Sequence, residues 1–192
     1  MTLGLSPSTH CSPNANYCNL TPYSQCILSS GSCSLMIEGL SAGNVNVSAY
    51  FSGDADNQNS SGEFPILITE ASTQTSVSCA PQSVIVGSPT RCQAVISGYY
   101  QTGNIGHYPM GNITFASSSP TGYFTPANQC IIWSNSSGTC HVDYYDTGLG
   151  SPQIEVFYGG DTNNAGSKGS TSVTVFWSSE YIWVVHGGFS ID

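Results

Sequence analysis

Residues 33–62 of this chain read CSLMIEGLSAGNVNVSAYFSGDADNQNSSG, and residues 140–169 read CHVDYYDTGLGSPQIEVFYGGDTNNAGSKG. The two stretches align without a gap at an offset of 107 residues, from 33 to 140. The residues of the first copy that recur unchanged are Cys33, Gly43, Gly53, Asp54, Asn57, Ser60 and Gly62. Further upstream, TPYSQC at 21–26 matches TPANQC at 125–130. Self-similarity at a fixed spacing indicates a repeated structural unit.

Both copies have the pattern of β-strands. Residues 45–51 alternate apolar and polar side chains, and residues 154–158 repeat this period of two, which is typical of a strand with one buried face. A turn rich in Gly, Asp, Asn and Ser follows each strand, and residues 130–133 with 139–144 suggest a hairpin. No segment has helical periodicity over three turns. The sequence therefore predicts an all-β protein made of two tandem β-sandwiches.

The two copies differ in completeness. Residues 71–176 contain about seven predicted strands and form a complete domain. Residues 1–70 have no counterpart of residues 75–110, so we expect the first domain to lack its first two strands. Residues 177–192 remain as a C-terminal tail.

At YFSGDADNQNSSG and FYGGDTNNAGSKG the chain resembles the bacterial and archaeal immunoglobulin-like repeat family, which is marked by a Tyr-x-Gly-Asp turn before its last strand. The segments GNITF, SSGTC and SVTV fit the same pattern. The resemblance implies immunoglobulin-like sandwiches in surface proteins, where they act as spacers, adhesin stalks or filament subunits without catalytic residues. The dense cysteines and the missing opening strands depart from the family pattern.

The charge balance excludes several classes of partner. The chain has 2 Lys or Arg residues against 11 Asp or Glu residues, a formal net charge of −9. Nucleic acids and anionic membranes are bound mainly through Lys and Arg, so neither is an expected partner. Only 7% of the residues are charged, and Ser, Thr and Asn supply most of the polar surface. This style resembles that of extracellular proteins of thermoacidophilic archaea.

The sequence contains no sign of enzymatic chemistry. It has no nucleophile elbow, P-loop or zincin motif, so we expect no catalytic residues, no cofactor and no metal centre. Two alternatives stay open. The acidic turns at 54–57 and 161–164 have oxygen ligands suited to Ca²⁺, although such residues more often close a hairpin. A loop with Tyr99, Tyr100, His107 and Tyr108 has aromatic rings for stacking on sugars.

Eight cysteines favour a disulfide framework and an oxidising, extracellular location. Proximity along the chain and the repeat favour local pairs. The predicted disulfides are Cys11 with Cys18, Cys26 with Cys33, Cys79 with Cys92, and Cys130 with Cys140.

Five Asn-x-Ser/Thr sequons are candidate sites for N-linked glycans. They lie at Asn19, Asn46, Asn59, Asn112 and Asn135. Asn19, Asn59 and Asn135 fall in predicted turns. Asn46 and Asn112 fall in or beside predicted strands and therefore need an outward face.

The tail has the pattern of a strand buried on both faces. Tyr181, Trp183 and Val185 would lie on one face, and Ile182 and Val184 on the other. We expect this donor strand to complete the first domain of another copy, which produces a head-to-tail filament on the cell surface. The alternative is a fragment of a longer multi-repeat adhesin or stalk, with carbohydrate binding as a further option.

Overall fold

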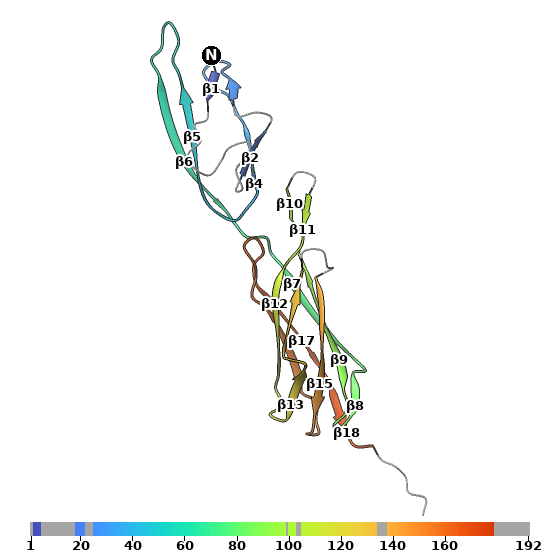
Figure 1. The fold of residues 1–192 in the computed structure, drawn as a ribbon. Helices are drawn as coiled ribbons and strands as arrows, with labels where there is room; N and C mark the ends of the chain where they lie inside the picture. Colours follow the sequence, from blue (N-terminus) through green and yellow to red (C-terminus); the bar gives the residue numbers. More distant parts are fainter. Residues whose placement is uncertain are drawn as a thin grey trace, which may run out of the picture.

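The structure is a computed structural model that describes residues 2–4, 18–21, 25–98, 100–102, 105–133 and 138–178. All its described regular elements are β-strands, β1 to β18. Figure 1 shows two modules that follow one another along the chain, with β1 to β6 in the first and β7 to β18 in the second. The predicted all-β fold class is confirmed.

The second module is a sandwich of two four-stranded antiparallel sheets. One sheet has the order β13-β15-β9-β7, and its strands are β13 (Gly122–Thr125), β15 (Thr139–Asp146), β9 (Thr90–Ser97) and β7 (Gln74–Ala80). The other has the order β14-β12-β16-β17, and its strands are β14 (Gln129–Ile132), β12 (Gly111–Ser117), β16 (Gln153–Tyr158) and β17 (Ser167–Ser172). β8 (Ser83–Ile85) pairs in parallel with β18 (Thr174–Phe176). β10 (Tyr100–Thr102) pairs with β11 (Ile105–His107) in an antiparallel ribbon. This arrangement is immunoglobulin-like.

The core of the second module follows from the period of two. Ile154, Val156 and Tyr158 on β16 are buried while the residues between them are exposed. They meet Phe115 and Val142 from β12 and β15 in one continuous apolar cluster. Burial of this apolar surface is the main stabilising term for the module.

The first module repeats one of these sheets. Its order is β3-β1-β5-β6, with β3 (Gln25–Ile27), β1 (Thr2–Gly4), β5 (Gly43–Phe51) and β6 (Ser60–Ile68). The register is conserved between the modules, because Leu3 lies opposite Phe51 just as Ile113 lies opposite Tyr158. The sheet therefore corresponds, strand by strand, to β14-β12-β16-β17.

The other sheet of the first module has two described strands, β2 (Cys18–Thr21) and β4 (Met36–Gly39). They correspond to β13 and to the end of β15, since Cys18 lies opposite Gly39 as Gly122 lies opposite Asp146. Among the residues that the structure describes, the first module has no counterpart of β7, β8 or β9. This agrees with the expectation that the first sandwich lacks its opening strands.

Three of the four predicted disulfides are present. They are Cys26–Cys33, Cys79–Cys92 and Cys130–Cys140. The fourth predicted pair includes Cys11, which lies outside the described residues. Closing a loop with a disulfide lowers the entropy of the unfolded chain, so each of these bonds stabilises its module.

The hairpin predicted from residues 130–133 and 139–144 is wrong. β14 pairs with β12, and β15 pairs with β9 and β13, so the two strands belong to opposite sheets. The Cys130–Cys140 disulfide therefore joins the two layers of the sandwich. An alternating pattern shows that a strand has one buried face, but it does not show to which sheet the strand belongs.

Candidate interaction site at the Asp turns

The Asp161 turn, residues 160–164, follows β16 and is closed by its own side chains. Asp161 N donates to Asn164 O at 2.9 Å, and Asp161 Oδ1 accepts from the backbone N–H groups of Asn163 and Asn164 at 2.8 and 2.9 Å. Gly160 has φ +87°, and a Cβ there would lie 2.7 Å from Asn164 O. Glycine is therefore required at this position.

The second carboxylate oxygen of Asp161 ties the turn to its module. Asp161 Oδ2 accepts from Met110 N at 2.9 Å and from the Tyr158 hydroxyl at 3.0 Å. Burial raises the pKa of the Asp161 carboxyl, but the hydrogen bonds that it accepts outweigh burial, and the net pKa lies below the ordinary 3.8. Burial and the neighbouring Asp161 raise the pKa of Tyr158 well above 10. The carboxylate stays ionised and acts as a fixed acceptor.

The Asp54 turn, residues 53–57, has the same geometry in the first module. Asp54 N donates to Asn57 O at 2.9 Å, and Asp54 Oδ1 accepts from Asp56 N and Asn57 N at 2.9 and 2.7 Å. Gly53 has φ +85°, and a Cβ there would lie 2.8 Å from Asn57 O. The backbone hydrogen bond from Asp56 and the side-chain hydrogen bond from Asn57 lower the pKa of Asp54.

The Asp161 turn holds the joint between the modules. Ala71, in the linker between β6 and β7, forms a parallel bridge with Asn164. Ala71 N donates to Asn163 O at 2.7 Å, and Ala165 N donates to Ala71 O at 2.8 Å. Ala42 N, from the end of the first module, donates to Asn163 Oδ1 at 2.8 Å. The turn thus binds the backbone of both the linker and the preceding module.

The Asp54 turn is exposed where the Asp161 turn is covered. Asn164 is 2% exposed, whereas its repeat counterpart Asn57 lies in the exposed class together with Asp54 and Asp56. A shallow hollow lined by residues 52–59 opens at this turn. The two turns therefore share one backbone geometry, but the Asp161 turn is covered by the linker and the Asp54 turn is exposed.

The inward face of the first module is also open. Phe64 on β6 is 67% exposed, and its neighbours Ile66 and Ile68 are half-buried. The counterparts of Ile66 and Ile68 on the second module, Val173 and Val175, are buried, and Thr171, the counterpart of Phe64, is half-buried. An exposed apolar face beside an unpaired sheet edge is a surface for strand addition.

The glycines Gly62 and Gly169 show the same difference between the exposed face of β6 and the covered face of β17. A Cβ at Gly169 would lie 2.4 Å from Thr75 O, because β7 packs directly against β17 there. A Cβ at Gly62, the repeat counterpart on β6, would meet nothing within 4 Å. The glycine is present in both copies, but the strand that requires it is seen only in the second.

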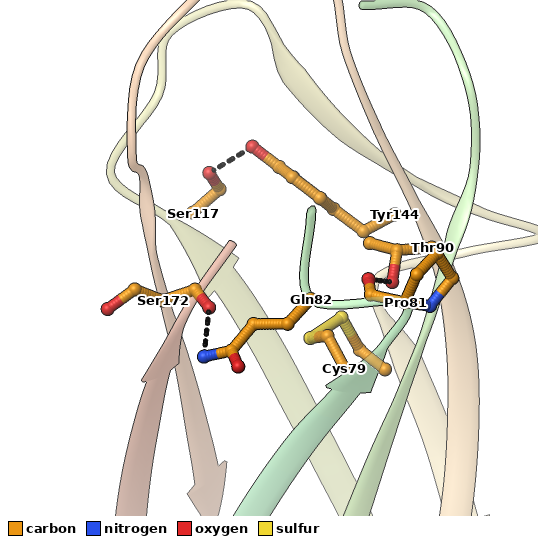
Figure 2. Close-up of a disulfide and its surroundings, with 8 residues drawn as sticks. Cys79, Pro81, Gln82, Thr90, Ser117, Tyr144 and Ser172 are labelled. Carbon is orange, nitrogen blue, oxygen red and sulfur yellow. Dashed lines mark hydrogen bonds between the residues drawn. A yellow bond between two sulfur atoms is a disulfide. The ribbon is translucent and has the colours of Figure 1, made fainter. Parts of the chain in front are cut away.

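A polar network at the other end of the second module is structural. Tyr144 shares a hydrogen bond of 2.8 Å with Ser117, close to the Cys79 disulfide (Figure 2). Tyr144 and Thr121 both donate to the buried carboxylate of Asp146, at 2.7 and 2.6 Å. Burial raises the pKa of Tyr144 to about 12. Burial also raises the pKa of Asp146, but the hydrogen bonds that its carboxylate accepts outweigh burial, and the net pKa lies below the ordinary 3.8.

The sequons that the structure describes lie on the surface or on an outer strand. Asn46, Asn59 and Asn112 are exposed, so the two in strands have the outward face that a glycan requires. Asn19 lies within β2 and not in the turn that the sequence predicted. Asn135 lies outside the described residues, as do the donor-strand residues Tyr181, Ile182, Trp183, Val184 and Val185.

The calcium and carbohydrate alternatives stay predictions. The Oδ1 atom of each turn aspartate is occupied by hydrogen bonds within its own turn, as expected of residues that close a hairpin. Within the described ranges, no group of three or more His, Cys, Asp or Glu side chains is placed to hold a metal ion. The aromatic loop is partly a two-stranded ribbon, in which Tyr100 lies opposite His107. No described helix is long and apolar enough to cross a membrane.

Comparisons with known proteins give structural likeness without close relatives. No family model matches the chain, and no curated protein matches it. The adhesin InvE of Yersinia pseudotuberculosis is 16% identical over 73% of this chain and 42% of its own, with a TM-score of 0.39. The D00-D0 domains of intimin are 12% identical over 91% and 99%, with a TM-score of 0.40.

The S-layer protein rSbsC(31-844) is 10% identical over 91% of this chain and 20% of its own, with a TM-score of 0.38. These scores are low, so the description of both modules as immunoglobulin-like depends on strand order and register.

The sequence did not predict that the turns at Asp54 and Asp161 are interaction sites. Their signal was the Gly-Asp-x-x-Asn pattern that both copies share.

Proposed function

We propose that this chain is a structural subunit of an extracellular surface filament, in which the tail of one copy completes the first module of the next. The observation that carries the proposal is the open inward face of β6, where Phe64 is 67% exposed. A strand laid on this face would bury apolar surface, which stabilises by about 25 cal/mol per Å².

The donor is the segment with residues 181–185, YIWVV. Its apolar side chains on both faces suit a strand that is covered on both sides. A contact between the tail of one copy and the first module of another is heterologous, and it generates an open polymer unless rotation closes a ring. Copies of the same chain are thus the proposed partners.

The proposed location is extracellular, at the cell surface. Three disulfides are typical of an oxidising compartment. A surface with very few charges and exposed sequons at Asn46, Asn59 and Asn112 is compatible with a glycan coat. The low-charge composition favours an archaeal source, and the proposed role is not enzymatic.

The alternative function is that of a segment within a longer multi-repeat adhesin or stalk. The repeat itself supports it, because a preceding module would also provide strands for the open face. In that case the strands are covalently connected to residues 1–70, and the native protein is heavier than this chain. Intact-mass measurement of the native protein separates the two functions.

Deletion of residues 179–192 tests the strand donation. The full chain should form filaments that are visible by negative-stain electron microscopy, and the deleted chain should remain monomeric in sedimentation velocity. A synthetic peptide of residues 179–192 should bind the deleted chain and raise the thermal midpoint of the first module. The matched control is the peptide with Ile182→Asp and Val184→Asp, which correspond to the inward-facing Thr75 and Val77 of β7. Filaments that form unchanged without the tail would refute the proposal.

A further inference from the structure

The two ends of the molecule carry the two halves of the joint that connects its modules. The offset of 107 residues continues past the aligned stretch, because Gly43 with φ +145° pairs with Ile68 as Gly150 with φ +142° pairs with Val175. The linker at 69–73 therefore corresponds to residues 176–180. By the same offset, β7 (Gln74–Ala80) corresponds to residues 181–187, YIWVVHG.

One half of the joint is the end of the second module around Gly150 and Val175. It corresponds to the end of the first module that binds the Asp161 turn through Ala42 and Ala71. The counterparts there are Leu149 and Ser178. Leu149 is 55% exposed and Trp177 is 66% exposed, so this end presents large apolar side chains to solvent.

The other half is the Asp54 turn at the far end of the first module. Its backbone has the geometry with which the Asp161 turn binds Ala71, including the hydrogen bond of 2.9 Å from the aspartate N–H to the carbonyl oxygen of the last asparagine in both copies. Its Asp56 carboxylate lies at the position of Asn163, whose side-chain oxygen accepts from Ala42 N. The Asp54 turn thus has an acceptor at every position that the covered turn uses.

We propose that the joint between the modules is repeated between copies, so that the Asp54 turn of one copy binds residues 176–178 of another. Ser178 bridges to Asn57 as Ala71 bridges to Asn164, and Leu149 N donates to the Asp56 carboxylate. This inference rests on the proposed function, and it fixes the register of the donated strand. Residues 181–187 then take the position of β7 against β6, with the backbone of Ile182 beside Gly62.

Gly62 supports this register independently of the turn. Ile182 corresponds to Thr75, whose carbonyl oxygen would lie 2.4 Å from a Cβ at Gly169. The same close approach at Gly62 requires a residue without a side chain, and the sequence has glycine there. A donor strand displaced by one residue would also turn its other face to Phe64.

The occupant is a second copy because this chain itself carries, at the offset of 107 residues, an apolar segment in the place of the linker and β7. In the register of this offset, Ser179 and Val184 repeat Ser72 and Val77 of the linker and β7. The proposal extends the offset past Phe176 without a gap, so that no extra length separates the turn contact from the strand. Each subunit boundary would then repeat the arrangement of the boundary within a subunit. The filament would contain one kind of joint at every module.

A designed disulfide tests the register. The variant with Ser178→Cys and Asn57→Cys should form a ladder of covalent multimers under non-reducing conditions, and mixing the two single variants should give dimers only. Ala71→Cys with Asn164→Cys is the positive control and should crosslink within one chain. Ser178→Cys with Ser48→Cys is the control for register and should give no ladder.

The outcomes separate the two proposals. A ladder in the Ser178 and Asn57 pair alone supports the repeated joint. Filaments that require residues 179–192 but give no ladder, with the positive control crosslinked, would overturn the register and leave strand donation standing. A full chain that stays monomeric and gives no ladder would contradict both. A native protein whose mass includes a further module before residue 1 would assign the Asp54 turn to that module.

Discussion

The two modules share a turn, a sheet and a disulfide position, but among the described residues a core built from two facing sheets is seen in the second module alone. Its buried cluster contains residues from both sheets, among them Phe115, Val142 and Ile154. In the first module the corresponding cluster consists of Val45 with the partly buried Ile37, Val47 and Ile68. The difference shows that the sheet β3-β1-β5-β6 is specified by its own sequence, while the core requires the strands that face it.

The largest expected difference between the modules is in their response to loss of a core side chain. Phe115→Ala should lower the free energy of unfolding of the second module by about 3–5 kcal/mol, because it leaves a cavity in a closed core. Val45→Ala should cost about 2 kcal/mol in the first module, since it removes less buried surface. Differential scanning calorimetry resolves the two transitions.

The control for this pair is Phe157→Ala, which removes a partly exposed ring from the outer face of β16. It should leave the free energy of unfolding of the second module within about 1 kcal/mol of the wild-type value. Equal losses for Phe115→Ala and Phe157→Ala would contradict the assignment of the core.

The second comparison is between the two glycines. Gly169→Val should destabilise the second module by about 1–3 kcal/mol or more, since its Cβ would overlap the backbone of β7. Gly62→Val should leave the stability of the isolated chain unchanged within about 0.5 kcal/mol, because a Cβ there meets nothing within 4 Å. Chemical denaturation followed by circular dichroism measures both.

Gly62→Val has the smaller expected effect on stability of the two glycine variants, but it should have the larger effect on filament assembly. Gly62→Val should abolish filaments while the chain remains folded, and Glu63→Ala, one residue away on the opposite face, should leave them intact. Filaments of normal morphology from the Gly62→Val chain would show that no strand packs against β6 at this position.

A smaller effect is expected from the turn aspartates. Asp161→Asn keeps the shape of the side chain but weakens hydrogen bonds from Met110, Tyr158 and the turn itself, and it should lower the stability of the second module by about 1–2 kcal/mol. The hydrogen bonds given for Asp54 lie within its own turn. Asp54→Asn should therefore lower the thermal midpoint by less than Asp161→Asn does. The reverse order would mean that the contacts to Met110 and Tyr158 contribute little.

Much of this fold was predictable, because short-range patterns and the repeat carry it. Alternation in residues 45–51 and 154–158 predicts strands, and the missing counterpart of 75–110 predicts the open module. The pairing of β14 was missed, since alternation does not identify the sheet that a strand joins. The role of Asn163 in the joint was also missed, because it depends on a contact with Ala42, which is 121 residues away.

The smallest expected effect is the dependence of the stability of the second module on pH, which we compare in acid and in alkali. Hydrogen bonds hold the pKa of Asp146 and Asp161 below 3.8 in the folded state, so the unfolded chain binds more protons in acid. Their contribution to stability should be complete above about pH 5 and should be lost as the pH falls below about 4 through the folded pKa values. The thermal midpoint from circular dichroism should therefore be flat near neutrality and decline in acid.

Two buried tyrosines, Tyr144 and Tyr158, should make the second module less stable at alkaline pH. The pKa of Tyr144 is raised to about 12 and that of Tyr158 is also raised, so both stay neutral in the folded module while the unfolded chain ionises near pH 10. Stability should be lost as the pH rises above about 10. Tyr158→Phe should make the alkaline decline shallower without removing the acid one, and Asp146→Asn should do the reverse. A midpoint that moves equally for both variants at both limits would show that net charge, and not these buried groups, controls the pH dependence.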